Sequence, residues 1–271
     1  MAATKENPII FYDIFSQTGP WSPSTYKTRL TLNYKRLPYR IEYLSIADIE
    51  SKLKELGVPP TLHNPFFPYT LPLIADPSSD PNEKPTYVVE SFDIALYLDQ
   101  RYPEPKYPAV IPPGTRTLQK IATSHIMNAA LNFGLVVLPC AVARPEFLDE
   151  RGREYYIRTR KVIYGRDIRE FLLEAGDNWT KAKEKWETLG DQLDLGGRDG
   201  PFVMGDQISF ADFAIGGVIH WVRKCEGREM TRWNDMSAWQ GGRWSAFWRE
   251  IEKLEANLEV TAQMILALTP F

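Results

Sequence analysis

Cysteines and long apolar runs are scarce in this chain. Its two cysteines, Cys140 and Cys225, lie far apart and form no Cys-x-x-Cys pair. We therefore expect neither a disulfide framework nor a thioredoxin-type redox pair, and we interpret both residues as buried thiols. No stretch approaches the roughly 20 apolar residues that span a bilayer, and the N-terminus lacks the basic start and apolar run of a secretory signal. We expect a cytoplasmic protein without a membrane partner.

An excess of charge of either sign is also missing. Lysine plus arginine number 32 and aspartate plus glutamate 35, which gives a net charge of −3. This balance argues against a surface that binds nucleic acid. The three histidines, His63, His125 and His220, share no spacing, and no cluster of His, Cys and acidic residues suggests a metal site. We therefore expect chemistry without a metal.

The chain does have enough apolar content for a packed core, since 44% of its 271 residues are hydrophobic and 25% are charged. Short apolar, β-branched runs alternate with helical spacings along the first hundred or so residues. We predict strands at 8–14, 39–44, 70–75 and 87–89. We predict helices at 24–37, at 47–56 and from 91 onward. The first unit is therefore βαβ followed by ββα, with a long polar loop at 76–86.

Prolines crowd the segment that follows this unit, at positions 103, 105, 108, 112 and 113. This composition stiffens a connection and stops helices from running through it. We place the domains at residues 1–103 and 114–271, joined by a proline-rich linker at 104–113. Beyond the linker no convincing strand is found, and helical patterns recur at 116–138, 149–174, 179–195, 209–223 and 244–267. The second domain is predicted to be all-helical.

Ser22 is followed by Pro23, a pair typical of a helix N-cap with proline at the first helical position. Capping alone would explain the serine. The same geometry also favours an anion, because a hydroxyl and free backbone amides meet in the positive potential of a helix N-terminus. A free thiol with a pKa of about 8.5 is mostly protonated at neutral pH, so a hydrogen bond from Ser22 would raise the fraction of thiolate.

Leu71-Pro72 falls near the start of a predicted strand, where a proline cannot donate to the sheet. A cis peptide bond is one way to accommodate it, although most X–Pro bonds are trans. The backbone there could then offer an amide and a carbonyl to an extended peptide.

Glu90-Ser91 lies at a junction between strand and helix, where Ser91 can be a simple cap and Glu90 a solvated edge residue. Alternatively, Ser91 and the helix N-terminus hold a ligand carboxylate while Glu90 binds an ammonium. An amino-acid zwitterion requires that pairing.

Together these three sites, in this order on a βαβ–ββα frame, resemble the glutathione transferases. Residues 22–30 (SPSTYKTRL) look like the active-site helix start of omega and zeta members, with serine where omega members carry cysteine. Leu71-Pro72 is similar to the family's cis-proline and Glu90-Ser91 to its γ-glutamyl-binding pair. Residues 205–212 (GDQISFAD) resemble its buried capping box, a structural motif. The resemblance covers nearly the whole chain and is greatest to serine-type, fungal-specific members related to bacterial lignin β-etherases.

The resemblance implies a glutathione transferase fold, an α/β plus all-α architecture with a thioredoxin-like βαβ-ββα domain followed by an all-helical domain. It implies that Ser22 donates a hydrogen bond to the sulfur of glutathione, with Ser24 in reserve. Leu71 and Pro72 would present backbone to the cysteinyl residue, and Glu90 with Ser91 would hold the γ-glutamyl end. Thiol exchange of the omega type is not expected without a cysteine at position 22. The family also implies a homodimer and no metal.

His63 is a further candidate, for the glycyl carboxylate of glutathione, unless it is an ordinary loop residue. The expected acceptors are hydrophobic aromatic electrophiles, and the role is detoxification. Acceptor-binding candidates are Phe15, Trp21, Met127, Leu131 and Phe133, unless these apolar residues face the core, as apolar helix residues usually do. The loop 76–86 and the extended stretch around 144–176 depart from the family and leave the shape of the acceptor site open.

Three functions remain open from the sequence. The first is a transferase, with conjugation, ether cleavage and peroxide reduction as alternative reactions. The second is a ligandin-like protein that carries aromatic or polyphenolic metabolites with little turnover, because a fold does not fix a function. The third is a regulatory member of the same superfamily.

Overall fold

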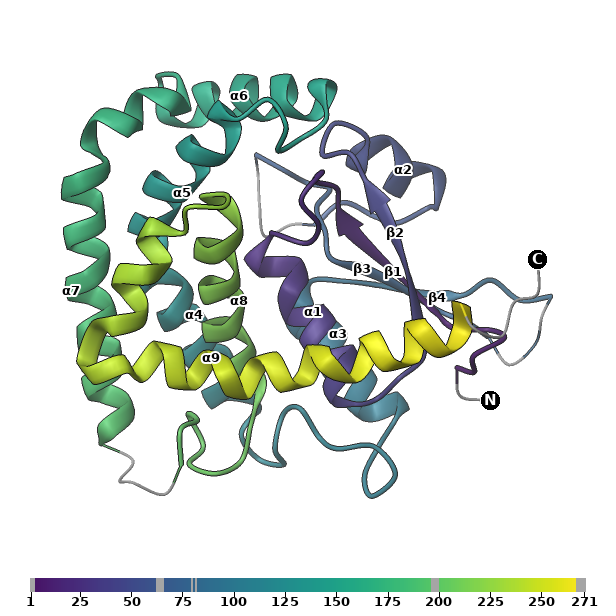
Figure 1. Cartoon of the computed structure of the whole chain (residues 1–271). Helices are drawn as coiled ribbons and strands as arrows, with labels where there is room; N and C mark the ends of the chain where they lie inside the picture. Colours follow the sequence, from purple (N-terminus) through teal and green to yellow (C-terminus); the bar gives the residue numbers. More distant parts are fainter. Residues whose placement is uncertain (1–2, 62–65, 79, 81, 196–199, 267–271) are drawn as a thin grey trace.

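The computed structural model describes residues 3–61, 66–78, 80, 82–195 and 200–266, with side chains in the last helix as far as residue 255. The first part of the chain forms a four-stranded sheet with helices packed on it (Figure 1). Its elements are β1 (Ile9–Ile14), α1 (Pro23–Tyr34), β2 (Tyr39–Leu44), α2 (Ile49–Glu55), β3 (Leu73–Asp76), β4 (Thr86–Val89) and α3 (Ser91–Arg101). The strand order is β2-β1-β3-β4, with β1 parallel to β2 and the other pairs antiparallel. The parallel pair needs a crossover, which α1 supplies.

The two faces of the sheet bury alternate residues of β1. Ile9 and Phe11 pack with residues of α1 and α3 on one face. Tyr12 and Ile14 belong to the other face, where the side chains of α2 cover them. This alternation is the period of two expected for a strand that is covered on both sides. A buried ion pair at 3.0 Å between Arg29 and Asp13 also ties α1 to β1.

The second part of the chain is helical. Its elements are α4 (Arg116–Ala129), α5 (Leu131–Ala143), α6 (Glu150–Tyr164), the 3-10 helix η1 (Ile168–Glu174), α7 (Ala175–Asp194), α8 (Phe210–Cys225) and α9 (Thr231–Leu266). Among the described residues of this part, β-type pairing is limited to isolated bridges between 202 and 207. The predicted fold class, a thioredoxin-like unit followed by an all-helical one, is confirmed. The segment between α3 and α4, where we predicted the linker 104–113, holds neither helix nor strand.

Several predicted helices have different bounds in the structure. The helix predicted at 116–138 breaks at Ala130, where α4 and α5 bend by 55°, and it continues past Pro139 to Ala143. The stretch predicted at 149–174 is divided after Gly165, which has a φ of 71° and ends α6. α9 (Thr231–Leu266) is interrupted by non-helical residues at 239–242, so the helix predicted from 244 is present after this kink, and the helical stretch at 231–238 before it was not predicted. Gly165 and the pair Gly241-Gly242 adopt positive φ at two of these breaks, as glycine at a helix end commonly does, whereas the break at Ala130 has no such local cause.

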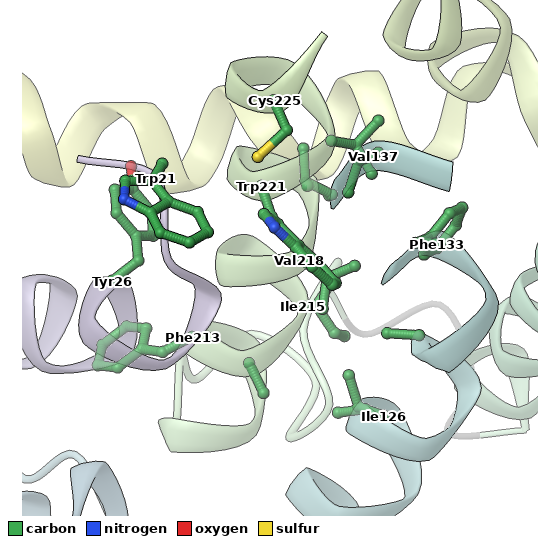
Figure 2. Packing of buried hydrophobic residues seen from close by; sticks show 14 of the residues in the cluster. Trp21, Tyr26, Ile126, Phe133, Val137, Phe213, Ile215, Val218, Trp221 and Cys225 are labelled. Carbon is green, nitrogen blue, oxygen red and sulfur yellow. The ribbon is translucent and has the colours of Figure 1, made fainter. Parts of the chain in front are cut away.

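Helix α8 joins the two parts of the molecule, because it lies side by side with α1 at the centre (Figure 1). Figure 2 shows side chains of α8 between Trp21 and Tyr26 on one side and residues of α4 and α5 on the other. Gly217 allows the close approach, since a Cβ there would lie 2.8 Å from the carbonyl oxygen of Pro23. The N-terminus of α1 is therefore seated directly on α8.

The predicted capping box at the start of α8 is present. Asp212 accepts hydrogen bonds from the backbone N–H and the hydroxyl of Ser209, both at 2.8 Å, and from the N–H of Val203 at 2.8 Å. These bonds satisfy donors that a buried helix end would otherwise leave unpaired.

Within the described part of the chain, no single helix is long and apolar enough to cross a bilayer. The bent pair α4 and α5 reaches the required length and composition only when both helices are counted together.

Candidate functional site

A cavity of about 380 Å³ lies between the sheet unit and the helical unit. The predicted site residues that line it are Trp21, Ser22, Ser24, Leu71, Glu90 and Ser91. They come from three segments that are distant in the sequence, and the fold brings them to one place. Its volume falls within the range of small-molecule sites.

Ser22 is the N-cap of α1, and Pro23 occupies the first turn, as the sequence predicts. The Ser22 Oγ accepts from the N–H of Thr25 at 3.5 Å, which is a long hydrogen bond. Because capping uses a lone pair of the oxygen, the hydroxyl hydrogen is left to be donated to a ligand. The two interpretations of Ser22, helix cap and hydrogen-bond donor, are therefore compatible with each other. Ser24 lies in the same first turn and also lines the cavity.

Leu71 lines the cavity with its backbone outside the sheet. The Leu71–Pro72 peptide bond is cis, and β3 begins only at Leu73. The ladder between β1 and β3 includes Leu73 but not Leu71, so the sheet does not use the amide and carbonyl of Leu71. Pro72 is buried behind it and is not part of the cavity wall. A peptide ligand in extended conformation could pair with Leu71 as a further strand would.

Glu90 has an unusual backbone, with a φ of 67° and a ψ of 121°. Few non-glycine residues adopt such a conformation, and it is found at functional sites more than elsewhere. Ser91 is not the cap we predicted, because Glu90 holds that position and Ser91 is the first helical residue of α3. Ser91, at the N-terminus of α3, still lines the cavity, and a helix N-terminus stabilises an anion.

Lys27 is a site residue that the sequence interpretation missed. It lies on α1 one turn after Ser24, lines the cavity, and is only 7% exposed. Burial lowers the pKa of its ammonium group to about 8, Glu90 counteracts this shift, and Lys120 adds to it. Among the described residues, no carboxylate lies within ion-pair distance of Lys27. An ammonium in such a place is stabilised by a ligand carboxylate.

Aromatic side chains form the wall on the side of the helical unit. Trp21 packs edge-on against Phe147 at 5.4 Å and against Tyr156 at 6.4 Å between ring centroids. Tyr155, Tyr156 and Arg160, all from α6, line this side. Burial raises the pKa of Tyr156 to about 12, so its hydroxyl remains protonated. The only sequence signal for these residues was the unusual length of the stretch around 144–176.

The remaining acceptor candidates do not line the cavity. Phe133 is fully buried in the core against Trp179, Trp186 and Trp239, and this placement corrects our prediction. Phe15, Met127 and Leu131 are also absent from the wall, and Leu131 is 64% exposed. Of the residues of α5, it is Leu138 that lines the cavity, one to two turns beyond the predicted candidates Leu131 and Phe133. His63 lies outside the described residues.

Three charged side chains line the cavity among the described residues. Glu90 is the one carboxylate among the described residues of the wall, and the cationic side chains of this wall are Lys27 and Arg160. Nowhere in the described chain are three or more His, Cys, Asp or Glu side chains grouped so that they could hold a metal ion. The site therefore offers helix N-termini, hydroxyls and charges of both signs for a zwitterionic ligand beside an aromatic wall.

Comparison with known protein families gives two matches that together span most of the chain. Residues 21–101 match the N-terminal domain of glutathione S-transferase, and residues 117–254 match its C-terminal domain. Among curated proteins, the chain is similar to the glutathione S-transferase-like protein ustS of Aspergillus flavus. The two are 33% identical over 96% of this chain and 95% of the relative.

Solved structures of fungal proteins superimpose closely on this chain. One is a glutathione S-transferase of Ceriporiopsis subvermispora in complex with glutathione, with a TM-score of 0.82, 34% identity, and coverage of 92% of this chain and 98% of that one. Another is the glutathione transferase GSTFuA3 of Phanerochaete chrysosporium, with a TM-score of 0.82, 31% identity, and coverage of 91% and 97%.

Proposed function

Because this chain belongs to the glutathione S-transferase superfamily, we propose that it is a glutathione transferase in which Ser22 activates the thiol of bound glutathione. The observation that carries the proposal is the meeting of Ser22, Leu71 and the Glu90–Ser91 pair in one cavity. Each of these sites has an ordinary structural explanation on its own. Their convergence matches the hydrogen-bonding needs of a γ-glutamyl tripeptide.

Glutathione carries two carboxylates, one ammonium and one thiol, and the cavity offers a partner for the groups at its γ-glutamyl end. Ser91 and the amides at the start of α3 receive the γ-glutamyl carboxylate, and Glu90 receives the ammonium. The backbone of Leu71 pairs with the cysteinyl residue. Lys27 adds a positive charge near Glu90, and we assign it to the γ-glutamyl carboxylate as well.

The thiol then lies at the N-terminus of α1. The hydroxyl of Ser22 donates a hydrogen bond to the sulfur, and the helix dipole favours the thiolate over the thiol. The proton passes to solvent, and the thiolate attacks an electrophilic carbon, which forms a carbon–sulfur bond as the leaving group departs. Ser24 is the alternative donor, because it lines the same cavity one residue into the helix. We place the acceptor against the aromatic wall of Trp21, Tyr155 and Tyr156.

The test is glutathione-dependent turnover of a panel of aromatic halides, aryl ethers and organic peroxides by the wild type and by Ser22→Ala. A hydrogen bond to a charged group contributes about 1.5–3 kcal/mol, so kcat/KM should fall roughly 10- to 100-fold in the variant. The panel identifies which reaction dominates. Wild-type turnover that Ser22→Ala and Ser24→Ala both leave unchanged would contradict hydroxyl activation of the thiol.

The aromatic wall also favours a second candidate, a carrier of planar aromatic molecules with little turnover. Trp21, Tyr155, Tyr156 and Trp221 all line the cavity, and such rings bind flat ligands whether or not a reaction follows. Thermal-shift binding of polyphenols distinguishes the two functions, because ligands that bind the folded state raise its melting temperature. A carrier would be stabilised equally in the wild type and in Ser22→Ala, and it would show no turnover.

A further inference from the structure

Arg160 is held between two aromatic rings, one from each part of the molecule. Its guanidinium carbon lies 3.9 Å from the ring centroid of Tyr156 on α6. It lies 4.5 Å from the ring centroid of Phe67, which belongs to the segment before Leu71. Both rings and Arg160 itself line the cavity. The guanidinium therefore has a fixed position at the cavity wall.

This stacking covers the two faces of the guanidinium and leaves its edge free to form hydrogen bonds. An arginine has five N–H donors in the plane of the group, and stacking on rings does not use them. The Nη1 of Arg160 donates to the hydroxyl of Thr159 at 3.0 Å. No carboxylate among the described residues lies within ion-pair distance of it, whereas Arg151, on the same helix, pairs with Asp48. A side-chain hydrogen bond from Arg160 also acts on the hydroxyl of Tyr156, where it lowers the pKa. Among the described residues the other donors of Arg160 have no carboxylate partner and are available to a ligand.

The position of Arg160 relative to the proposed thiolate indicates which ligand its free donors would bind. Trp21, next to Ser22, contacts the ring of Tyr156, and Tyr156 contacts Arg160. A flat acceptor that lies on this wall with its reacting carbon near Ser22 would extend its far side toward Arg160. Glu90, the one carboxylate of the described wall, is already assigned to the ammonium of glutathione. Among the residues that the structure describes, the positive charge of Arg160 is thus left without a counter-charge.

We propose that Arg160 binds a carboxylate of the acceptor, so that the preferred electrophiles are aromatic acids. The inference rests on the proposed function for the reaction, but the binding itself does not depend on turnover. The glycyl carboxylate of glutathione is the other source of the same chemical group. The experiment therefore measures the kinetic constants for glutathione and for the acceptor separately.

The kinetic test uses two acceptors that differ only in charge, 4-chloro-3-nitrobenzoate and 4-chloro-3-nitrobenzamide. In both, the thiolate forms a carbon–sulfur bond, the carbon–chlorine bond breaks, and chloride leaves with the electron pair. The wild type should prefer the benzoate in kcat/KM. Arg160→Gln should reduce this preference roughly 10- to 100-fold, the range for a hydrogen-bonded charge pair, while KM for glutathione stays the same.

Arg158→Gln is the matched control, because Arg158 is an exposed arginine of the same helix whose guanidinium carbon lies 5.7 Å from the ring centroid of Tyr155. This variant should keep the preference for the benzoate. Arg160→Lys keeps the charge but loses the planar stack, so it should retain part of the preference. A raised KM for glutathione in Arg160→Gln, with the preference for the benzoate intact, would assign Arg160 to the glycyl carboxylate and overturn the proposal.

A binding measurement keeps the inference testable if the protein has no transferase activity. Quenching of tryptophan fluorescence, with S-methylglutathione present, reports the affinity for 3-nitrobenzoate and for 3-nitrobenzamide. The benzoate should bind more tightly to the wild type and to Arg158→Gln, and this difference should vanish in Arg160→Gln. Equal affinities for the two probes in the wild type would overturn the proposal. Circular dichroism and melting curves establish that the variants are folded.

Discussion

The Nε2 of His220 on α8 lies 2.8 Å from the carbonyl oxygen of Pro20, two residues before Ser22. Because a carbonyl oxygen can only accept, Nε2 carries the hydrogen in this contact. The imidazole also stacks on Tyr26 of α1, with 3.7 Å between ring centroids. One residue of the helical unit therefore holds both the segment that leads to Ser22 and the helix that follows it.

Replacement of His220 by Phe should keep the stacking on Tyr26 and leave the carbonyl of Pro20 unpaired. An unsatisfied buried acceptor costs about 1–3 kcal/mol, and because Pro20 is only partly buried, urea unfolding should show a loss toward the lower end of that range. Turnover should fall as well, because Ser22 is no longer fixed. His220→Gln can still donate a hydrogen bond to the carbonyl of Pro20, so it should recover part of the stability and part of the turnover. A Phe variant with unchanged stability and activity would show that the contact has no role.

The stability of the protein should depend on His220 at acid pH. Burial lowers the pKa of His220 to about 3. The pKa is also lowered by the positive charges of Lys224, Arg29 and Arg223. In the unfolded chain the group titrates near its ordinary value of about 6.5. Its contribution to stability is therefore complete above pH 6.5 and is lost as pH falls toward 3, by up to about 1.4 kcal/mol per pH unit. The free energy of unfolding of His220→Phe should fall less steeply in this window than that of the wild type.

Lys27 should improve ligand binding at the expense of stability. Its buried ammonium has a pKa lowered to about 8, so the unfolded chain holds this proton more firmly than the folded protein. Lys27→Met should therefore melt no lower than the wild type while it binds S-methylglutathione less tightly. That ligand has no thiol to titrate, so wild-type affinity should fall as pH rises through 8 more steeply than that of Lys27→Met. Calorimetric titration at several pH values measures the affinity of the wild type and of Lys27→Met for this ligand. Identical pH profiles of the two affinities would exclude a carboxylate partner for Lys27.

The capping role of Ser22 can be separated from its role as a donor with Ser22→Asp. Aspartate caps a helix about as well as serine, so the free energy of unfolding should change by less than about 0.5 kcal/mol. An ionised carboxylate cannot donate and repels a thiolate, so kcat/KM should fall at least about 10-fold. The ultraviolet absorbance of bound glutathione thiolate should appear only at higher pH. Normal activity in this variant together with its loss in Ser24→Ala would make Ser24 the donor.

The features that could be predicted from the sequence are those with local causes. The signature of Ser22-Pro23 depends on the geometry of one helix turn, and the predicted strand at 39–44 coincides with β2 (Tyr39–Leu44). Leu71-Pro72 stands out because proline is unfavourable near the start of a strand. In each case the chemistry of two or three neighbouring residues is enough to indicate the structure.

The features that were missed depend on residues brought together by folding. Lys27 and Arg160 are charged, and charged residues are ordinarily solvated, so nothing in their neighbours indicates a cavity wall. Phe133 is a candidate wall residue in the sequence because it lies on the first predicted helix of the second domain, at 116–138, and no glycine or proline marks the bend at Ala130. The direction of a side chain after such a bend is set by the tryptophans that surround it in the core.

Replacement of Glu90 by glycine should raise the stability of the protein and lower its affinity for glutathione. Its φ of 67° and ψ of 121° are unfavourable for any side chain with a Cβ, and glycine adopts them more readily. Glu90→Gly should therefore raise the free energy of unfolding by about 1 kcal/mol in urea titrations. It should also weaken the binding of glutathione roughly tenfold or more, because the ammonium loses its carboxylate partner. Glu90→Gln keeps the Cβ and the strain but not the charge, so it should bind as weakly as the glycine variant without the gain in stability. Undiminished affinity in both variants would remove Glu90 from the site and leave its backbone conformation without a functional reason.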